Sequence, residues 1–144
     1  MRRTARNGMP IGVIMLDVDN FKRFNDTFGH GASVTMLNSM AKRRRSRTRA
    51  GGIASRYGGE EFTLVMRGAA LESTRVRAER LRREVKQLQV QYESRVLGQI
   101  TLSVGVASFP QHGSSAQSLL QAADSALYEA THGGRDRVAV APAI

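Results

Sequence analysis

The sequence of 144 residues contains no cysteine, and this absence excludes two classes of site. Without thiols, neither a disulfide framework nor a zinc site with cysteine ligands can form. No apolar run approaches the length of a membrane span, and the N-terminus, Met1-Arg2-Arg3-Thr4, lacks the apolar segment of a signal peptide. We therefore expect a cytoplasmic domain, whose parent protein can still be membrane-anchored.

Acidic residues are scarce. The sequence contains 12 Asp and Glu and 22 Lys and Arg, so its formal net charge is +10. Such a balance favours anionic partners, namely nucleic acid, polyphosphate nucleotides or an acidic protein surface. Much of the positive charge lies in residues 42–49 and 75–86, and charge runs of this kind are typical of solvated helix faces. No stacking aromatics alternate with these arginines, so nucleic acid is not an expected partner.

The order of predicted elements indicates one folded domain spanning residues 1–144. An apolar fraction of 41% excludes a disordered chain. We expect strands at 10–16, 53–57, 62–66, 99–107 and 138–140, and helices at 21–28, 32–47, 71–90 and 116–132. Asn20 is expected to cap the helix at 21–28. This order predicts an α+β fold: a ferredoxin-like β-α-β-β-α-β core with an extra helix, in which helices flank a central, mainly antiparallel sheet.

Carboxylates stand at two places where predicted strands end. Asp17 and Asp19 follow the first strand and are expected to face the same side, because strand side chains alternate. Glu60 and Glu61 follow the hairpin turn Gly58-Gly59. If the first strand lies beside this hairpin, Asp17 approaches Glu60, and their oxygens can bind a divalent cation. The alternative is a solvated acidic hairpin tip.

These residues belong to blocks that resemble the GGDEF family, over about residues 11–140. The segment Arg56-Tyr57-Gly58-Gly59-Glu60-Glu61-Phe62 is similar to the family signature in its glutamate-containing form. The other matching blocks, in order, are Asp17-Val18-Asp19-Asn20-Phe21-Lys22, Asn25-Asp26-Thr27-Phe28-Gly29-His30, Thr101-Leu102-Ser103-Val104-Gly105-Val106-Ala107, Ala123-Asp124-Ser125-Ala126-Leu127-Tyr128 and Gly134-Arg135. The family's N-terminal segment is not visible, so we expect a single GGDEF domain without it or a truncated piece.

The resemblance implies a bacterial diguanylate cyclase with a fold similar to nucleotidyl cyclases and polymerase palms. Such an enzyme condenses two GTP into cyclic di-GMP and two pyrophosphates with Mg²⁺ or Mn²⁺, in the second-messenger signalling associated with biofilms. One active site holds half of the reaction, so a homodimer is implied. A sensory domain normally precedes this module in the parent protein.

The resemblance also implies roles for individual residues. Asp17 and Glu60 would be metal ligands, assisted by the Val18 carbonyl, and Glu61 would position or activate the nucleophile. The residues implied to hold the nucleotide are Asn20 and Phe21 through backbone N–H groups, Lys22 and Arg135 through charge on the phosphates, and Asn25 through a hydrogen bond to guanine. Without the resemblance, each of these is an ordinary surface residue.

Three positions depart from the family pattern. Ser33-Val34 replace a Gly-Asp pair whose carboxylate pairs with guanine, and Thr131 replaces a phosphate-neutralising lysine. The inhibitory product site, an Arg-x-x-Asp motif, is reduced to Arg49 and Gly52, with Arg80 as a secondary contact. The sequence therefore predicts a cyclase of low activity. The alternative is a degenerate module that binds GTP weakly or serves as a regulatory or interaction domain.

Overall fold

The computed structural model describes residues 9–29, 31, 52–57, 61–87, 90–93, 95–97 and 99–142, with the backbone alone for the strands at 52–57, 90–92 and 95–97. Several sequence predictions lie outside these residues: the helix at 32–47, the Gly58-Gly59 turn, Glu60, Val34 and Arg49. Within the described part, none of the helices combines the length and apolar character needed to cross a bilayer.

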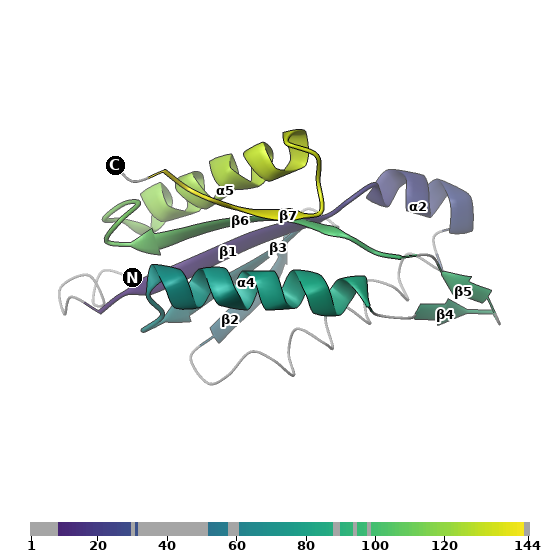
Figure 1. Ribbon diagram of the computed structural model, residues 1–144, viewed down its shortest axis with the longest axis horizontal. Helices are drawn as coiled ribbons and strands as arrows, with labels where there is room; N and C mark the ends of the chain where they lie inside the picture. The colour runs from purple at the N-terminus through teal and green to yellow at the C-terminus, as the bar shows by residue number, and fades with distance from the viewer. Residues whose placement is uncertain are drawn as a thin grey trace.

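A five-stranded sheet forms the centre of the molecule (Figure 1). Its strands, in spatial order, are β2 (Gly52–Tyr57), β3 (Glu61–Arg67), β1 (Ile11–Val18), β6 (Leu102–Phe109) and β7 (Arg137–Val140). Neighbours are antiparallel except β6 and β7, which are parallel. The predicted mainly antiparallel α+β fold, with the first strand beside the hairpin, is thereby confirmed.

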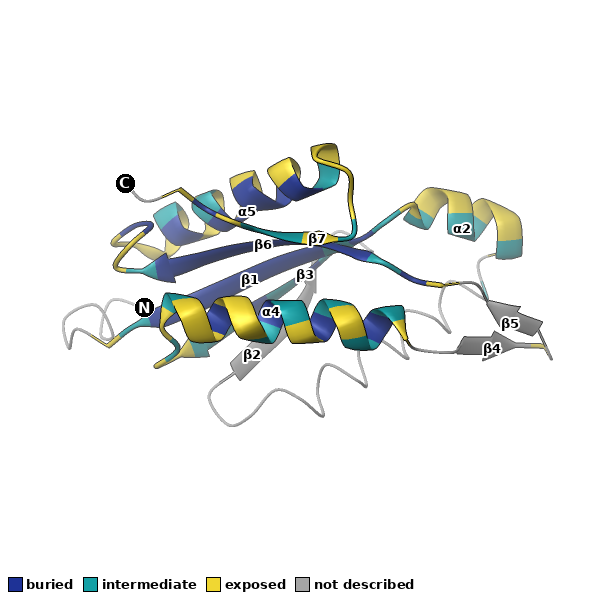
Figure 2. Ribbon diagram, viewed as in Figure 1, coloured by how far each residue is buried: buried dark blue, intermediate teal, exposed yellow. Residues whose placement is uncertain are grey.

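The two long helices cover opposite faces of this sheet, so β1 is buried on both sides (Figures 1 and 2). Side chains of β1 alternate between two clusters, as strand geometry requires. The cluster under α4 (Leu71–Lys86) includes Ile14, Leu16, Val18, Ala78, Leu81 and Val85. The cluster under α5 (Ala116–His132) includes Ile11, Val13, Met15, Leu119, Ala123 and Leu127. This double burial explains the continuous apolar run of β1.

Glycines let both helices approach the sheet closely. A Cβ added at Gly105 of β6 would lie 2.2 Å from the Ala123 carbonyl oxygen and 2.3 Å from the Leu127 nitrogen of α5. A Cβ added at Gly12 of β1 would lie 1.9 Å from the Thr74 hydroxyl oxygen of α4. Any side chain at these strand positions therefore overlaps a helix.

The helix boundaries agree with the sequence prediction except at the end of α4. The helices α2 (Phe21–Phe28) and α5 have the expected limits. The helix predicted to reach residue 90 ends at Lys86, because β4 (Val90–Tyr92) and β5 (Arg95–Leu97) form a separate two-stranded sheet. Strands of three residues are too short for a recognisable alternation.

A buried histidine links the connection after β6 to the C-terminal segment. The Nδ1 of His112 accepts a hydrogen bond of 2.9 Å from the Ser108 N–H, and the ring also interacts with the Ala141 backbone. Burial lowers the pKa of His112 below its ordinary value of 6.5, and the Ala141 contact only partly offsets this effect. The folded protein therefore holds this ring in its neutral form.

The buried ring predicts a loss of stability in mild acid. An unfolded histidine takes up a proton near pH 6.5, whereas folded His112 does so only at lower pH, so the unfolded state binds more protons between these values. The free energy of unfolding should fall as the pH drops below about 6.5. Urea denaturation at pH 7.5 and 5.5 measures this dependence, which should be weaker in His112→Asn. The exposed His132→Asn serves as control, and equal pH dependence in His112→Asn and the wild type would contradict the assignment.

Candidate functional site

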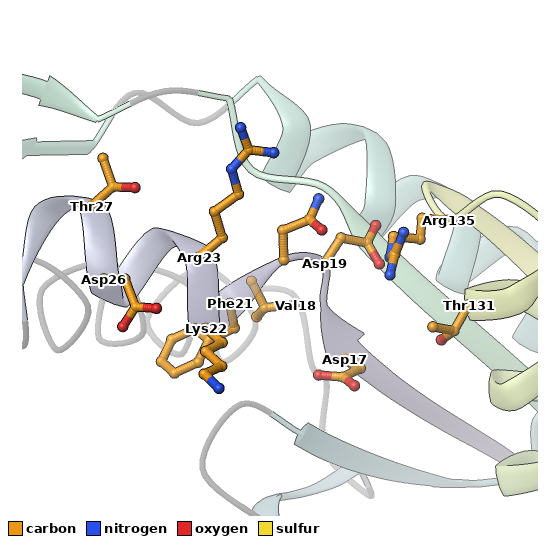
Figure 3. A pocket seen from close by; sticks show the side chains of 11 residues that line it. Asp17, Val18, Asp19, Phe21, Lys22, Arg23, Asp26, Thr27, Thr131 and Arg135 are labelled. Carbon is orange, nitrogen blue, oxygen red and sulfur yellow. The ribbon is translucent and has the colours of Figure 1, made fainter.

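A pocket of about 570 Å³ lies where β1 ends and α2 begins (Figure 3). It is bordered by the end of β1, by residues 21–27 of α2, and by the end of α5 with its connection to β7. The lining residues are Asp17, Val18, Asp19, Asn20, Phe21, Lys22, Arg23, Asp26, Thr27, Thr131 and Arg135. The fold thus brings together residues from opposite ends of the sequence.

Asp17 lies within the central strand, in contrast to its predicted place beyond the strand end, because β1 continues to Val18. The strand register puts Asp17 opposite Glu61 of β3 and opposite Ser103 of β6. Residues directly opposite each other in an antiparallel pair share one face of the sheet. Glu61 is therefore the nearest hairpin partner of Asp17 among the described residues, while Glu60 lies outside them.

The donor atoms at this edge suit a hard divalent cation. Asp17 and Glu61 supply carboxylate oxygens, and the Oδ1 atom of Asp17 is buried. Carboxylate and carbonyl oxygens are the ligands preferred by Mg²⁺ and Mn²⁺. Within the described residues no three His, Cys, Asp or Glu side chains form a metal-binding group. A complete ligand set thus requires Glu60 or the nucleotide phosphates.

Asp19 has a structural role that its position beside Asp17 did not reveal. Its carboxylate accepts hydrogen bonds of 2.7 Å from Thr101 Oγ1, 2.5 Å from Ser103 Oγ and 3.0 Å from the Asp136 N–H. Three donors from two other segments fix this carboxylate in place. Asp19 therefore joins the end of β1 to β6 and to the turn before β7.

Asn20 begins α2 through its backbone, and the prediction that its side chain caps the helix is wrong. Its φ and ψ are 57° and 32°, and its side chain makes no capping hydrogen bond. Asparagine is among the few non-glycine residues that tolerate this left-handed conformation. The first N–H groups of any helix lack intrahelical partners, and those of α2 start at Phe21 and Lys22, in the wall of the pocket.

The helix α2 contributes different residues from those the sequence indicated. Lys22 lines the pocket as expected, whereas Asn25 is absent from its lining and is half-buried elsewhere on α2. Sequence reasoning gave no role to Arg23, Asp26 and Thr27, which also line the pocket. Asp26 and Thr27 belong to a matching block and Arg23 directly follows one, but nothing in the sequence shows that their side chains face this pocket. The described pocket therefore contains the residues expected to contact phosphate and does not contain Asn25, which is expected to contact guanine.

Thr131 occupies the place of the missing lysine without replacing its chemistry. Its hydroxyl donates a 3.0 Å hydrogen bond to the Leu127 carbonyl of its own helix. The cations among the described lining residues are therefore Lys22, Arg23 and Arg135. Arg80, the predicted secondary inhibitory contact, lines a separate pocket of about 340 Å³ beside α4.

Arg135 is held at the pocket by an unusual turn. Arg135 and Asp136 have φ values of 63° and 47°, and each left-handed non-glycine residue costs about 1–2 kcal/mol. The Asp136 carboxylate is bonded by Arg82 Nη1 at 2.6 Å and by Lys86 Nζ at 2.5 Å. Burial alone would raise the pKa of Asp136, but these two cations of α4 lower it below its ordinary value.

The chain is similar to known proteins over most of its length. The profile of the GGDEF family, described as diguanylate cyclase, GGDEF domain, matches residues 1–137. Diguanylate cyclase A of Treponema denticola is 38% identical over 128 residues, which cover 89% of this chain and 34% of that protein. Diguanylate cyclase VdcA of Vibrio cholerae is 41% identical over 133 residues, which cover 91% of this chain and 39% of that protein. The chain thus spans little more than a third of these relatives.

Solved structures agree with this assignment. The GGDEF domain of DgcB from Caulobacter crescentus, in complex with c-di-GMP, matches with a TM-score of 0.89 and 34% identity. That match covers 96% of this chain and 81% of the other. The active GGEEF domain of a Vibrio cholerae diguanylate cyclase matches with a TM-score of 0.90 and 30% identity, over 99% of this chain and 89% of the other. The family match over nearly the whole chain, together with these relatives, places this chain in the GGDEF family of diguanylate cyclase domains.

Proposed function

We propose that this chain is the catalytic domain of a bacterial diguanylate cyclase, which condenses two GTP molecules into cyclic di-GMP and two pyrophosphates. One observation carries the proposal: Asp17, opposite Glu61, shares a pocket with the cations Lys22 and Arg135. Carboxylates suit a divalent cation, and lysine and arginine suit the oxygens of a polyphosphate. The parent protein would act in the cytoplasm, under control of an upstream sensory domain.

In each condensation the 3′-hydroxyl oxygen of one GTP forms a bond to the α-phosphorus of the other, and the bond to pyrophosphate breaks. A bound Mg²⁺ or Mn²⁺, held by Asp17, Glu60 and the Val18 carbonyl, would lower the pKa of the hydroxyl and neutralise phosphate charge. Glu61 orients this hydroxyl and accepts its proton. Each subunit of a homodimer presents one GTP, so two subunits complete the reaction.

The remaining residues bind the triphosphate. The N–H groups at the start of α2 can donate to the β- and γ-phosphates, as helix N-termini commonly do. Lys22 and Arg135 add positive charge from two sides of the pocket. Asn25, which lies outside this pocket lining, would contact guanine.

A second candidate is a degenerate module that binds GTP weakly and has a regulatory role. The Thr131 hydroxyl is engaged by Leu127, so one phosphate cation is lost, and Val34 cannot accept hydrogen bonds from guanine. Incubation with GTP and Mg²⁺ or Mn²⁺, followed by chromatography, separates the two functions. Cyclic di-GMP is expected from the enzyme. GTP binding without product at high protein concentration would overturn the cyclase function and support the regulatory module.

Restoring the missing cation should strengthen GTP binding. Thr131→Lys puts an ammonium group at the pocket wall, and a charged hydrogen bond to a ligand contributes about 1.5–3 kcal/mol. The KM for GTP should therefore fall roughly tenfold or more, and Val34→Asp should add to this effect. Gln121→Lys, on the exposed side of the same helix, is the control for added charge. An unchanged KM in Thr131→Lys would show that this position does not face the phosphates.

A further inference from the structure

Asp136 connects the pocket to a helix on the opposite face of the sheet. Its backbone N–H donates to Asp19, while its carboxylate is bonded by Arg82 and Lys86 of α4. Arg82 is held in turn by a second ion pair, with Glu79 one turn earlier. The Asp136 and Arg82 side chains are only 28% and 16% exposed, so water screens their ion pair less than a surface pair.

The two α4 cations lie outside the pocket lining, yet they are bonded to the residue next to Arg135. These contacts lie next to β7, the edge strand that begins directly after Asp136. Arg135 itself is tied to α5, because its N–H donates to the Ala130 carbonyl at 3.0 Å. The turn is therefore fixed by α5 and the Asp19 carboxylate on one side and by α4 on the other.

We propose that Asp136 is a positioning residue for the nucleotide, and that Arg82 and Lys86 act through it to hold Arg135 at the pocket. This inference rests on the proposed function, because it takes Arg135 as a contact of the GTP phosphates. Two consecutive left-handed residues are retained only where their surroundings hold them. Without the ion pairs to α4, the turn relaxes toward ordinary backbone angles, and the Arg135 side chain moves away from the GTP phosphates.

The test removes the two α4 cations that bond Asp136 and substitutes no residue of the turn itself. The variant Arg82→Met/Lys86→Met retains the aliphatic bulk of both side chains and loses both charges. It is combined with Arg135→Ala in a double-mutant cycle, with GTP affinity measured by calorimetry in the presence of Mg²⁺. Lys86→Arg retains a donor for Asp136 and is the conservative variant. Glu72→Gln disrupts an exposed ion pair with Arg75 on the same helix and is the matched control.

If Arg82 and Lys86 act through Arg135, the loss of GTP affinity caused by the α4 double variant and the loss caused by Arg135→Ala should not be additive. We expect Arg135→Ala to weaken GTP binding about 10- to 100-fold and the α4 double variant about 10-fold. The variant that carries all three substitutions should bind GTP no more weakly than Arg135→Ala alone. Lys86→Arg and Glu72→Gln should bind GTP like the wild type. Thermal unfolding of each variant establishes that it is folded.

Additive losses would overturn the inference, because they would show that α4 affects binding without Arg135. Wild-type affinity in the α4 double variant, or in Arg135→Ala, would also overturn it. The KM for GTP should rise in the α4 double variant while kcat stays within about twofold, since a ground-state phosphate contact is weakened. GTP binding without cyclic di-GMP from the wild type would contradict the proposed function alone, because the cycle is read from affinities.

Discussion

Asp17→Asn is expected to reduce cyclic di-GMP formation by at least about 100-fold while the protein remains folded. The substitution retains the size of the side chain and removes the charge that a divalent cation requires. Losses of 10- to 100-fold follow even when a partner of a metal ligand is removed, so loss of the ligand itself should exceed that range. Product formation from GTP at saturating Mn²⁺ is the measurement.

Although Asp17→Asn should reduce activity, it should not reduce the stability of the metal-free protein. Asp17 and Glu61 face each other across β1 and β3, and like charges directly opposite each other destabilise a sheet. Without divalent metal, Asp17→Asn should therefore unfold at the same temperature as the wild type or higher. Added Mn²⁺ should raise the unfolding temperature of the wild type but not that of Asp17→Asn, because a ligand stabilises the state that binds it. Asp124→Asn, on the exposed side of α5, is the control. Wild-type turnover in Asp17→Asn would refute the metal assignment.

Gly105→Ala should be the most destabilising single-methyl change in the described core. The new Cβ would meet backbone atoms of Ala123 and Leu127 at 2.2 and 2.3 Å, and a helix backbone cannot rotate away as a side chain can. Overpacking typically costs 1–3 kcal/mol, and contacts with backbone put this case at about 3 kcal/mol or more. For a domain of this size, that loss lowers the unfolding temperature by roughly 10 °C.

A matched control separates steric overlap from backbone preference. Gly68 has a φ of 78°, and nothing lies within 4 Å of a Cβ added there. Gly68→Ala therefore carries only the penalty of a left-handed alanine, about 1 kcal/mol. Thermal and urea denaturation of both variants give the comparison. An unfolding temperature of Gly105→Ala equal to that of Gly68→Ala would show that α5 shifts at little cost.

The fold was predictable where long segments carry a regular pattern. The apolar run of β1 and the periodicity of α5 fixed both elements, because burial on two faces or on one stripe leaves a clear signature. The β4–β5 hairpin has strands of three residues and left no such pattern. Asn20 was misassigned as a side-chain cap because cap preference and tolerance of a left-handed φ select the same residue type.

The sequence predicted the motif residues of the site, but not the contacts that hold them in place. The carboxylate of Asp17 and the cations Lys22 and Arg135 stand in recognisable blocks, and the pocket lining contains all three. The hydrogen bond from Asp136 to Asp19 joins residues 117 positions apart, and no local pattern marks such a pair. Only the folded chain shows that α4 reaches the turn next to Arg135.

The edge strand β7 is the last of the sheet strands in the sequence, which has a consequence for the order in which the pocket is made. The end of β1 that carries Asp17 leaves the ribosome before Arg135 and β7, which follow more than a hundred residues later. A nascent chain thus contains Asp17 and Lys22 long before Arg135 is added. Under the proposed function, the contact between Arg135 and the GTP phosphates forms only after this last strand has been made, so GTP would stabilise the finished domain and not its early folding intermediates.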